Sequence, residues 1–511
     1  MTKFNPPVGV LIFAIFLLFL PVAATANCTG STPTWTSTPD QSSVASCVSN
    51  ARSGDTINVS AGSATWSGLV TISNKSVNVI GAGQGKTVIT SGGFLLVNSA
   101  SRISAFSFNW SSNNYTFQVQ GSVGFRIDHN TVVYPSASDM MLSYGQGGIP
   151  VEGLVDNNTI TYGRIIYYGD NNSPGTGGSN RWAEPLNQGT SHYLYIEDNT
   201  ISWPDGSSGG YLNNIDGNQG CRYVVRFNKI LNGRVEAHSL QGESQRGCRA
   251  WEIYNNTFTT NSKPAYRPFL IRAGTGVIFH NTSDGGFLNN GVDIDNDRSY
   301  ETSIGCQVPT FNMCGSTQPS WPSNCNATSG WVKNSAGTSY IDGNTSGQYG
   351  YPCRDQIGRS TDGSQWNYTN PAPAQAFQPA YIWRNTQPSG EIPVNIDCDN
   401  SGIDCSIETT YHIVLNRDVY TYASSFNGTS GVGEGTLAER PSTCTAGVVY
   451  WATDSGNWNQ SGNGAGQGQL YVCKTNNTWA LQYTPFTYPH PLQADGSANP
   501  VPPSGLQAIV Q

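Results

Sequence analysis

Charge is scarce in this sequence. Asp, Glu, Lys and Arg together make up 11% of its 511 residues, and the excess of acidic residues gives a formal net charge of −8. A protein that holds nucleic acid by its phosphates needs a basic surface, so this balance argues against a nucleic-acid partner. Only six histidines are present, and no two cysteines have the spacing Cys-x-x-Cys. The sequence therefore argues against a zinc finger.

Long apolar runs are missing after the first 26 residues. Val8–Leu20 is an apolar run of thirteen residues behind Lys3, and Ala24-Thr25-Ala26 is a small-x-small motif. This pattern is typical of a signal peptide, and the run is too short to span a bilayer comfortably. We therefore predict that residues 1–26 are a signal peptide cleaved near Ala26. The mature chain is then expected to be a secreted, extracellular or periplasmic monomer without a membrane span.

The twelve cysteines, an even number, all follow the predicted signal peptide. In an exported protein this favours disulfides, although the sequence leaves their connectivity open. Pairing each cysteine with its neighbour in the sequence predicts Cys28–Cys47, Cys221–Cys248, Cys306–Cys314, Cys325–Cys353, Cys398–Cys405 and Cys444–Cys473.

Short apolar segments that end in asparagine recur along the chain. Their spacings are 28, 41, 29, 28 and 25 residues, and two further copies follow after longer gaps. The copies are FRIDHNTV (Asn130), GLVDNNTI (Asn158), LYIEDNTI (Asn199), VVRFNKIL (Asn228), WEIYNNTF (Asn256), GVIFHNTS (Asn281), YIDGNTS (Asn344) and YIWRNTQ (Asn385). A period of this length predicts an all-β solenoid in which successive coils bury one another's apolar face. Asparagine suits such a stack because its amide can bond the same amide one coil away, and because it tolerates left-handed turns.

The region before the repeats is predicted to cover one end of the stack. Val44, Cys47, Val48 and Ala51 have the spacing of a short amphipathic helix that ends at Gly54. The next segment, ARSGDTINVSAGSATWSGLVTISNKSVNVIGAGQGKTVI, resembles the opening cap and first coils of pectate-lyase-like right-handed parallel β-helix proteins. The resemblance covers about residues 40 to 420. It implies a right-handed parallel β-helix with an N-terminal helical cap, and it favours polysaccharide lyase activity on a fold that also carries hydrolases, epimerases and phage tailspikes.

The domain organisation follows from these features. The last part of the chain alternates aromatic and polar residues, which predicts a small disulfide-clipped β-sheet that packs on the last coil or binds carbohydrate. Long insertions, where binding groups usually lie, interrupt the coils at 168–192, 283–340 and 346–376. The predicted parts are the signal peptide (1–26), the N-terminal cap (27–72), the parallel β-helix with its long loops (73–420) and the C-terminal β region (421–511).

The few charges of the chain concentrate in one place. Between Arg234 and Glu252, 19 residues hold three Arg, three Glu and one His. In the short strand GRVEAH, alternation puts Val235 and Ala237 inside and Arg234, Glu236 and His238 outside. Neighbouring coils would add charged residues to the same outer wall. Candidates for that wall are Asp205, Asp216, Arg222, Glu243, Arg246, Arg249, Arg267 and Arg272.

This charged wall predicts a catalytic groove for an acidic, uronate-containing polysaccharide. β-Elimination requires neutralising the carboxylate, removing the C5 proton and protonating the leaving oxygen; Arg or Ca²⁺ serves the first task and a side chain of suitable pKa the second. The segment around His238 and Arg246 also resembles the His/Arg-bearing coils of β-helix alginate lyases. We predict catalytic roles for Arg234, His238, Arg246 and Arg272, and substrate contacts for Trp182, Glu236, Glu243, Arg249, Arg267 and Arg354.

Other interpretations stay open at this stage. Asp293, Asp295 and Asp297 in GVDIDNDRSYE form a candidate Ca²⁺ site, although the segment lacks the glycine and the final acidic residue of an EF-hand loop. The charges also fit ion pairs between coils with no catalytic role. A non-catalytic, adhesin-like protein that binds glycan through loop residues such as Trp182 and Trp331 is one alternative function. A glycoside hydrolase is another.

Overall fold

The computed structural model of the chain describes residues 27–112, 114–169, 181–182, 184–205, 213–238, 247–295, 357–360, 376–397, 409, 413–461 and 467–494. Several predictions from the sequence fall outside these residues. They are the signal peptide, Asn344, the three cysteine pairs between Cys306 and Cys405, and the site candidates Glu243, Arg246, Asp297, Trp331 and Arg354.

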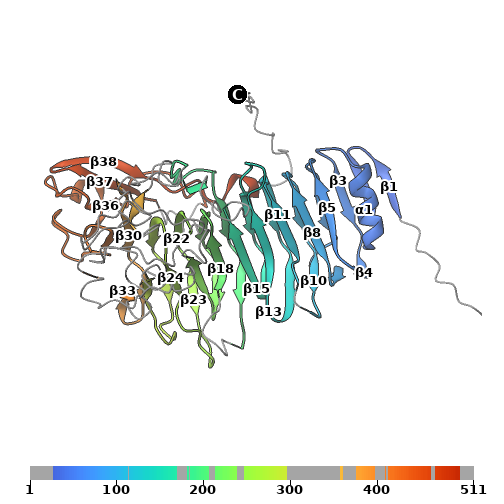
Figure 1. Cartoon of the computed structure of the whole chain (residues 1–511), viewed down its shortest axis with the longest axis horizontal. Helices are drawn as coiled ribbons and strands as arrows, with labels where there is room; N and C mark the ends of the chain where they lie inside the picture. Colours follow the sequence, from blue (N-terminus) through green and yellow to red (C-terminus); the bar gives the residue numbers. More distant parts are fainter. Residues whose placement is uncertain are drawn as a thin grey trace, which may run out of the picture.

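A long parallel sheet runs the length of the molecule (Figure 1). Only its first pairing, between β1 and β2, is antiparallel. In spatial order its thirteen strands are β1 (Cys28–Ser31), β2 (Thr34–Ser37), β3 (Thr56–Val59), β6 (Asn78–Gly81), β9 (Arg102–Ser104), β12 (Val123–Asp128), β14 (Glu152–Asp156), β16 (Leu194–Glu197), β19 (Arg222–Arg226), β22 (Ala250–Tyr254), β25 (Thr275–Phe279), β30 (Ala380–Trp383) and β34 (Val419–Thr421).

A second sheet of nineteen strands consists of two rows that are joined because β13 (Thr131–Tyr144) and β15 (Thr159–Tyr168) pass through both. Row 1 contains β4 (Gly62–Thr65), β7 (Thr87–Thr90), β10 (Ser107–Asn109), the first halves of β13 and β15, β17 (Thr200–Ser202), β20 (Lys229–Leu231), β23 (Thr257–Thr259), β26 (Thr282–Ser283), β31 (Thr386–Gln387) and β32 (Gly390–Glu391). Row 2 contains β5 (Leu69–Ser73), β8 (Gly93–Val97), β11 (Phe117–Gln120), the second halves of β13 and β15, β18 (Asn213–Asn218), β21 (Arg234–Ala237), β24 (Phe269–Ile271), β27 (Val292–Asp295) and β33 (Val394–Asp397).

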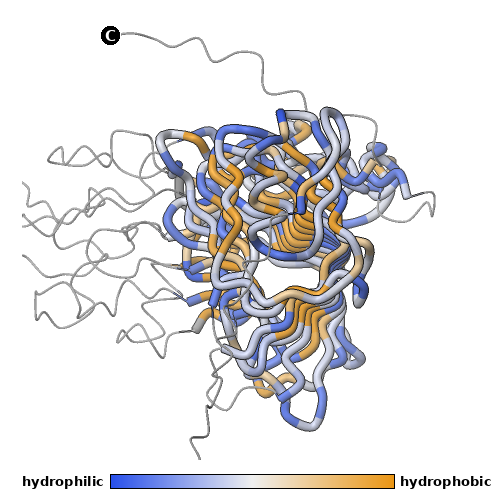
Figure 2. The backbone as a smooth tube through the Cα atoms, turned by 90° about the vertical axis from the view of Figure 1, so that its right-hand side faces the viewer, coloured by the Kyte–Doolittle hydropathy of each residue, from blue (hydrophilic) through white to orange (hydrophobic). Residues whose placement is uncertain are grey.

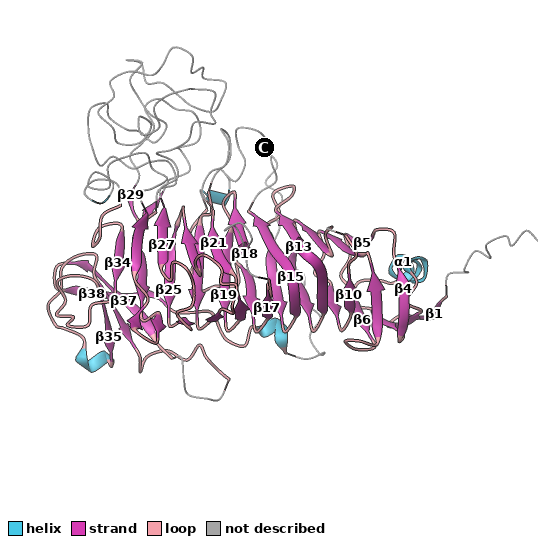
Figure 3. Cartoon of the chain, turned by 90° about the horizontal axis from the view of Figure 1, so that it is seen from below, coloured by secondary structure: helices cyan, strands magenta, loops and turns pink. Residues whose placement is uncertain are grey.

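The chain visits the long sheet, row 1 and row 2 in turn, so each circuit of three strands is one coil. For example, β19, β20 and β21 make one coil, and β22, β23 and β24 pair with them in parallel as the next. Apolar residues of equivalent positions stack inside, and they form aligned columns in the view along the stack (Figure 2). The protein therefore has the all-β, solenoid-like architecture that the repeat predicts, with strands lying across its long axis (Figure 3).

The recurring asparagines form a buried ladder. In Asn228, the backbone N–H and Nδ2 both donate to Asn256 Oδ1 at 3.0 Å, and its own Oδ1 accepts the matching pair of bonds from Asn199. The same bonds connect Asn130, Asn158, Asn199, Asn228, Asn256, Asn281 and Asn385. The predicted amide stacking is thus confirmed for every copy in the described part of the chain.

The left-handed turn beside the ladder is one residue earlier than the sequence argument placed it. The residue that precedes each ladder asparagine has a positive φ, for example 58° at Phe227 and 55° at Asn255. The ladder asparagines themselves are not among the residues with positive φ. Their recurrence is therefore explained by their amide bonds rather than by tolerance of the left-handed region.

A helix packs at the N-terminal end of the stack, as expected. Helix α1 (Gln41–Asn50) buries Val44, Cys47 and Val48 and contacts β1, β2, β3 and β5. It ends at Asn50 rather than near Gly54, because Ala51 is already extended with φ −67° and ψ 147°. No helix in the described part of the chain is long and apolar enough to cross a membrane.

The C-terminal region forms a four-stranded sheet of β35 (Val432–Gly435), β36 (Val449–Ala452), β37 (Gln469–Thr475) and β38 (Thr478–Tyr483). It packs along the outer face of the long sheet over several coils, not only on the last one, and shares a second apolar cluster with residues from Leu154 to Trp383. Arg226 Nη1 and Nη2 donate to the carbonyls of Phe486 and Thr487 at 2.7 and 2.9 Å. Short connecting elements are the hairpin β28 (Arg359–Ser360) and β29 (Ala376–Phe377), and the 3-10 helices η6 (Leu437–Glu439) and η7 (Pro491–Gln493).

Three of the predicted disulfides are confirmed: Cys28–Cys47, Cys221–Cys248 and Cys444–Cys473. The first joins β1 to helix α1, the second lies within the coils, and the third clips the C-terminal sheet. Disulfides of this kind fit an oxidising, extracellular compartment.

We predict that Asn228→Ala destabilises the protein by about 2–4 kcal/mol, because it leaves the buried amides of Asn199 without their acceptor. Asn58→Ala, at an exposed strand position, is the matched control and should change stability by less than about 0.5 kcal/mol. Urea unfolding measures both. Equal effects of the two substitutions would refute a stabilising role for the ladder.

Glu252, buried where the C-terminal sheet meets the coils, predicts a pH dependence of stability. Burial raises its pKa to about 7 from the usual 4.5, although Tyr483 Oη and the Gly189 amide donate to its carboxylate at 2.6 and 2.8 Å. The folded state therefore retains a proton that the unfolded chain releases, so stability falls as pH rises from about 4.5 to about 7, by about 3 kcal/mol at most.

Glu252→Gln should flatten this decline and should make the protein more stable than the wild type at pH 8. The control is Glu439→Gln, at an exposed residue whose pKa is lowered by the Thr436 amide, and it should leave the slope unchanged between pH 5 and pH 8. Thermal melting across that range is the measurement. A Glu252→Gln variant with the wild-type slope would be inconsistent with a protonated Glu252 in the folded state.

Candidate functional site

Strand β21 carries the centre of the charged stretch on the outer face of row 2. Val235 and Ala237 point into the core with no exposed surface, as alternation predicts. Arg234, Glu236 and His238 lie on the opposite face, where their exposed fractions are only 4%, 0% and 8%. The predicted orientation of the strand is therefore correct, and the outer side chains are buried among neighbouring groups.

The parallel register sets the neighbours of these side chains. Glu236 is opposite Asp216 on β18 and Leu270 on β24. His238 extends the pairing of β21 with β18, because its amide donates to the Gly217 carbonyl. The Arg272 amide extends the pairing of β24 with β21 in the same way, by donating to the carbonyl of Ala237. Charged side chains from three successive coils are thereby brought together. We call Asp216, Arg234, Glu236, His238 and Arg272 the charged cluster.

Glu236 is the anion at the centre of this cluster. Arg234 Nη2 donates to Glu236 Oε2 at 2.6 Å, and Arg272 Nη2 donates to Oε1. Burial alone would raise the pKa of Glu236, but the charges of Arg272, His238 and Arg234 outweigh it and lower the pKa to about 2. Glu236 is therefore ionised at neutral pH, and it holds the two guanidinium groups beside the imidazole.

His238 lies between two carboxylates. Its Nδ1 is 3.6 Å from Asp216 Oδ1, and its Nε2 is 3.6 Å from Glu236 Oε1. The other oxygen of Asp216, Oδ2, accepts a hydrogen bond from Asn213 Nδ2 at 3.2 Å, and Arg164 Nη1 lies 3.7 Å from the same oxygen. An imidazole in this position lies close to two carboxylates and has the chemistry to exchange a proton with a bound ligand.

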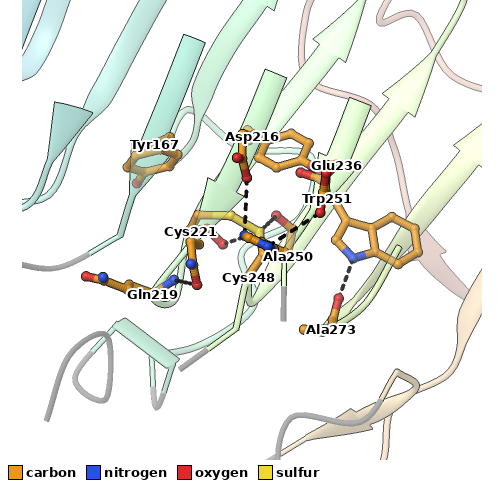
Figure 4. Close-up of a disulfide and its surroundings, with 12 residues drawn as sticks. Tyr167, Asp216, Gln219, Cys221, Glu236, Cys248, Ala250, Trp251 and Ala273 are labelled. Carbon is orange, nitrogen blue, oxygen red and sulfur yellow. Dashed lines mark hydrogen bonds and ion pairs between the residues drawn. A yellow bond between two sulfur atoms is a disulfide. The ribbon is translucent and has the colours of Figure 1, made fainter. Parts of the chain in front are cut away.

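A disulfide supports the cluster from the core side. Figure 4 shows Asp216 and Glu236 on neighbouring strands beside the bond between Cys221 and Cys248. Cys248 also donates its amide to the His238 carbonyl at 2.8 Å. A side chain at Gly217 would collide with the Cys221 sulfur, which its Cβ would meet at 2.4 Å, so this position requires glycine. The disulfide thus ties Cys248, whose amide bonds to the His238 carbonyl, to Cys221 of the preceding coil.

Two predicted substrate-binding residues lie elsewhere. Trp182 is fully buried, and the guanidinium of Arg249 lies over its ring at 5.1 Å. Arg249 Nη2 donates to Gln378 rather than toward Glu236. Arg222, another candidate for the outer wall, donates to the carbonyls of Arg181, Glu184, Pro185 and Leu186. Arg222 and Arg249 therefore contact the segment around Trp182, because Arg222 begins β19 and Arg249 precedes β22, both strands of the long sheet and not of row 2.

Two other candidates have separate partners. Asp205 is exposed, accepts a hydrogen bond from Tyr162 and lies 3.7 Å from Lys263. Arg267 pairs with Asp293 at 2.9 Å, one coil beyond the charged cluster. Among the predicted positions, the structure therefore brings together Arg234, Glu236, His238, Arg272 and Asp216.

Of the proposed Ca²⁺ ligands, Asp293 and Asp295 lie in the described part of the chain and Asp297 lies outside it. Both carboxylate oxygens of Asp293 are taken up, by Arg267 and Asn289 on one side and by Asn395 on the other, each at 2.9 Å. No group of three or more His, Cys, Asp or Glu residues within the described ranges has the geometry of a metal site. The arrangement around Asp293 is an ion pair and amide network, and the Ca²⁺ site stays a prediction.

Four residues beside the cluster were not singled out from the sequence. Arg164 Nε pairs with Asp139 Oδ1 at 2.6 Å, and Tyr144 and Tyr168 occupy facing outer positions on β13 and β15. Their only sequence signal is strand alternation in DMMLSY and RIIYY. The irregular register between β13 and β15 hides which of these residues share a row, so spacing alone could not find them.

Comparison with known proteins adds no assignment. Neither a scan against protein-family models nor a search of curated proteins returned a match to this chain.

We predict that Glu236→Gln destabilises the protein by about 3 kcal/mol at neutral pH, because two guanidinium groups lose their buried counter-charge. The lowered pKa means that Glu236 stabilises the fold above pH 4.5 and loses this contribution as pH falls toward about 2. Between pH 7 and pH 3 the variant should therefore lose less stability than the wild type.

The control for this substitution is Glu391→Gln, which breaks a partly exposed pair with Arg384 at 3.2 Å and should cost less than about 1 kcal/mol. Urea unfolding at pH 7 and pH 3 measures both variants. If Glu236→Gln were no more destabilising than the control, Glu236 could not be the anion that holds the cluster together.

Proposed function

We propose that the protein is a right-handed parallel β-helix that cleaves a uronate-containing polysaccharide by β-elimination. The observation that carries the proposal is the convergence of Arg234, His238 and Arg272 around Glu236 on one outer face of row 2. A stack of coils holds these groups, and a polymer would meet them at the exposed parts of Arg272 and His238, 13% and 10% of their side chains. The acidic net charge of the chain makes this local group of cations a specific feature rather than part of a basic surface.

The groups of the cluster match the tasks of the reaction. With His238 neutral, Arg234 and Arg272 balance Glu236 and Asp216, and the two guanidinium groups can bond a substrate carboxylate through charge-assisted hydrogen bonds. With the carboxylate neutralised, His238 accepts the C5 proton, and the electron pair of that C–H bond forms the C4–C5 double bond. The C4–O4 bond breaks at the same time, and the imidazolium returns the proton to the leaving oxygen. Atoms and charge balance without a cofactor.

Hydrolysis is less well supported by the same residues. A glycoside hydrolase of the common type needs one carboxylic acid that stays protonated to assist the leaving group. Glu236 has a pKa of about 2 and is bonded to two arginines. Asp216 already accepts from Asn213 and lies beside Arg164. Glu236 is thus held ionised by its two arginines, and both carboxyl groups of the cluster are engaged by neighbouring polar groups.

Binding without cleavage also has less support. That alternative placed the glycan on loop tryptophans, and Trp182 is fully buried. Trp331, the other ring it invoked, lies outside the described residues. Catalysis at the charged cluster therefore remains the better proposal.

We predict that the wild-type protein, incubated with alginate, polygalacturonate and other anionic glycans, releases unsaturated products that absorb in the ultraviolet. His238→Asn should lower kcat/KM by at least about a hundredfold, the usual contribution of a general base. Arg272→Lys should act chiefly on KM, because a lysine cannot reproduce the planar contact of a guanidinium with a carboxylate. The matched control is His129→Asn on the long sheet, where asparagine tolerates the positive φ of 53°; it should stay within twofold of wild type.

The mass of the products separates the alternatives, because hydrolysis adds one water that elimination does not. Products that carry the extra water would replace the lyase with a hydrolase. Full activity of His238→Asn would remove the proposed centre.

A further inference from the structure

We propose that the glycan lies along the axis of the stack, and that Tyr144 and Tyr168 bind sugar rings on the N-terminal side of the charged cluster. The inference rests on the proposed function for the class of ligand, a uronate-containing polysaccharide. It adds the direction of the bound polysaccharide and a second part of the binding surface, which is aromatic where the charged cluster is ionic.

The register places these tyrosines in line with the cluster. On row 2, Gln120 pairs with Tyr144, Tyr144 with Tyr168, and Tyr168 with Asn218. His238 and Arg272 continue the same line through the backbone bonds to Gly217 and Ala237. Adjacent strands of a sheet are about 4.8 Å apart, so the outer side chains form a straight series along the axis.

Tyr144 and Tyr168 face outward and keep part of their surface exposed. Their inward neighbours Ser143 and Tyr167 are buried in the core, which fixes the alternation. The two outward rings are therefore available to a ligand on the surface, on consecutive coils. Flat aromatic faces next to hydroxyl and amide groups suit a sugar ring, which has an apolar face and a polar edge.

The polar residues beside these rings are balanced in charge. Arg164 pairs with Asp139 at 2.6 Å, and both side chains are partly exposed, at 31% and 26%. This end of the surface therefore carries no surplus cation for a carboxylate. It offers hydrogen-bond donors and acceptors for hydroxyl groups, whereas the cluster around Glu236 offers two guanidinium groups beside an imidazole. We expect the uronate that reacts to lie over His238, and sugars farther along the polymer, beyond the coil of Asn218, to lie over Tyr168 and then Tyr144.

Two double variants test this placement. Tyr144→Ala/Tyr168→Ala removes both rings, and Tyr144→Phe/Tyr168→Phe retains the rings without the hydroxyls. Tyr422→Ala is the control, because Tyr422 packs under Arg384 at 5.0 Å in another part of the molecule. Each is made in the full chain that also carries His238→Asn, so that the polymer stays intact. Affinity electrophoresis through gels that contain alginate or polygalacturonate measures binding, and thermal melting checks that each variant is folded.

We expect the alanine pair to bind the polymer at least tenfold more weakly, and the phenylalanine pair and Tyr422→Ala to bind within about threefold of their parent. Polymer binding that is unchanged in a folded alanine pair would overturn the inference even if the protein is a lyase. Binding that depends on the two rings, in a protein that releases no product, would support the inference and reject the lyase activity. A parent that binds no glycan of the panel would reject both. If the alanine pair does not fold, the affinity of the phenylalanine pair is measured for uronate oligosaccharides of increasing length. The inference requires that this affinity rise from disaccharide to hexasaccharide. An affinity that does not change with length contradicts it.

Discussion

The structure depends on one repeated constraint, the buried amide bonds between asparagines of successive coils. Each ladder asparagine gives its backbone N–H and its Nδ2 to the Oδ1 of the next, and its Nδ2 also donates to main-chain carbonyls such as Ile196 O at 2.8 Å for Asn228. A strand that slipped by one residue would leave these buried groups unpaired and would turn its side chains to the other face. The ladder therefore fixes which residues of neighbouring coils face the core and which share the outer wall.

The charged cluster is a consequence of this fixed register. Buried charges are costly unless they are paired, and Glu236 provides the pairing for Arg234 and Arg272 while it lies 3.6 Å from His238. Three cationic or titratable groups are thereby held close together on the wall, beside a disulfide that ties Cys248 to the preceding coil. The same geometry continues toward Tyr168 and Tyr144, where charge is balanced and aromatic rings remain partly exposed. One face thus offers a charged end and an aromatic end.

Much of this arrangement could be predicted from the sequence. The spacing of the asparagines predicted the solenoid, and alternation in Arg234–His238 predicted the outer face of β21 correctly. Pairing of neighbouring cysteines predicted the three described disulfides. Side chains near strand ends could not be placed in this way. Arg222, Arg249 and Trp182 were assigned to the outer wall or to substrate, yet they pack together where strands of the long sheet begin, because the position of a turn does not follow from a repeat length. Arg164 and Tyr168 were missed because their strand joins its neighbour with an irregular register. The domain boundaries at 72 and 420 and the catalytic roles stay predictions.

The central claim is that stacked coils assemble one surface on which the carboxylate of a uronate is neutralised and its C5 proton removed, while the polymer that contains it lies along the axis of the stack. A crystal structure of the His238→Asn variant soaked with a uronate hexasaccharide tests it most directly. The account predicts one sugar carboxylate within hydrogen-bond distance of Arg272 or Arg234, with C5 of that sugar facing position 238 and the chain continuing over Tyr168. A hexasaccharide bound across the coils at another face, or with its carboxylates turned away from both arginines, would contradict it.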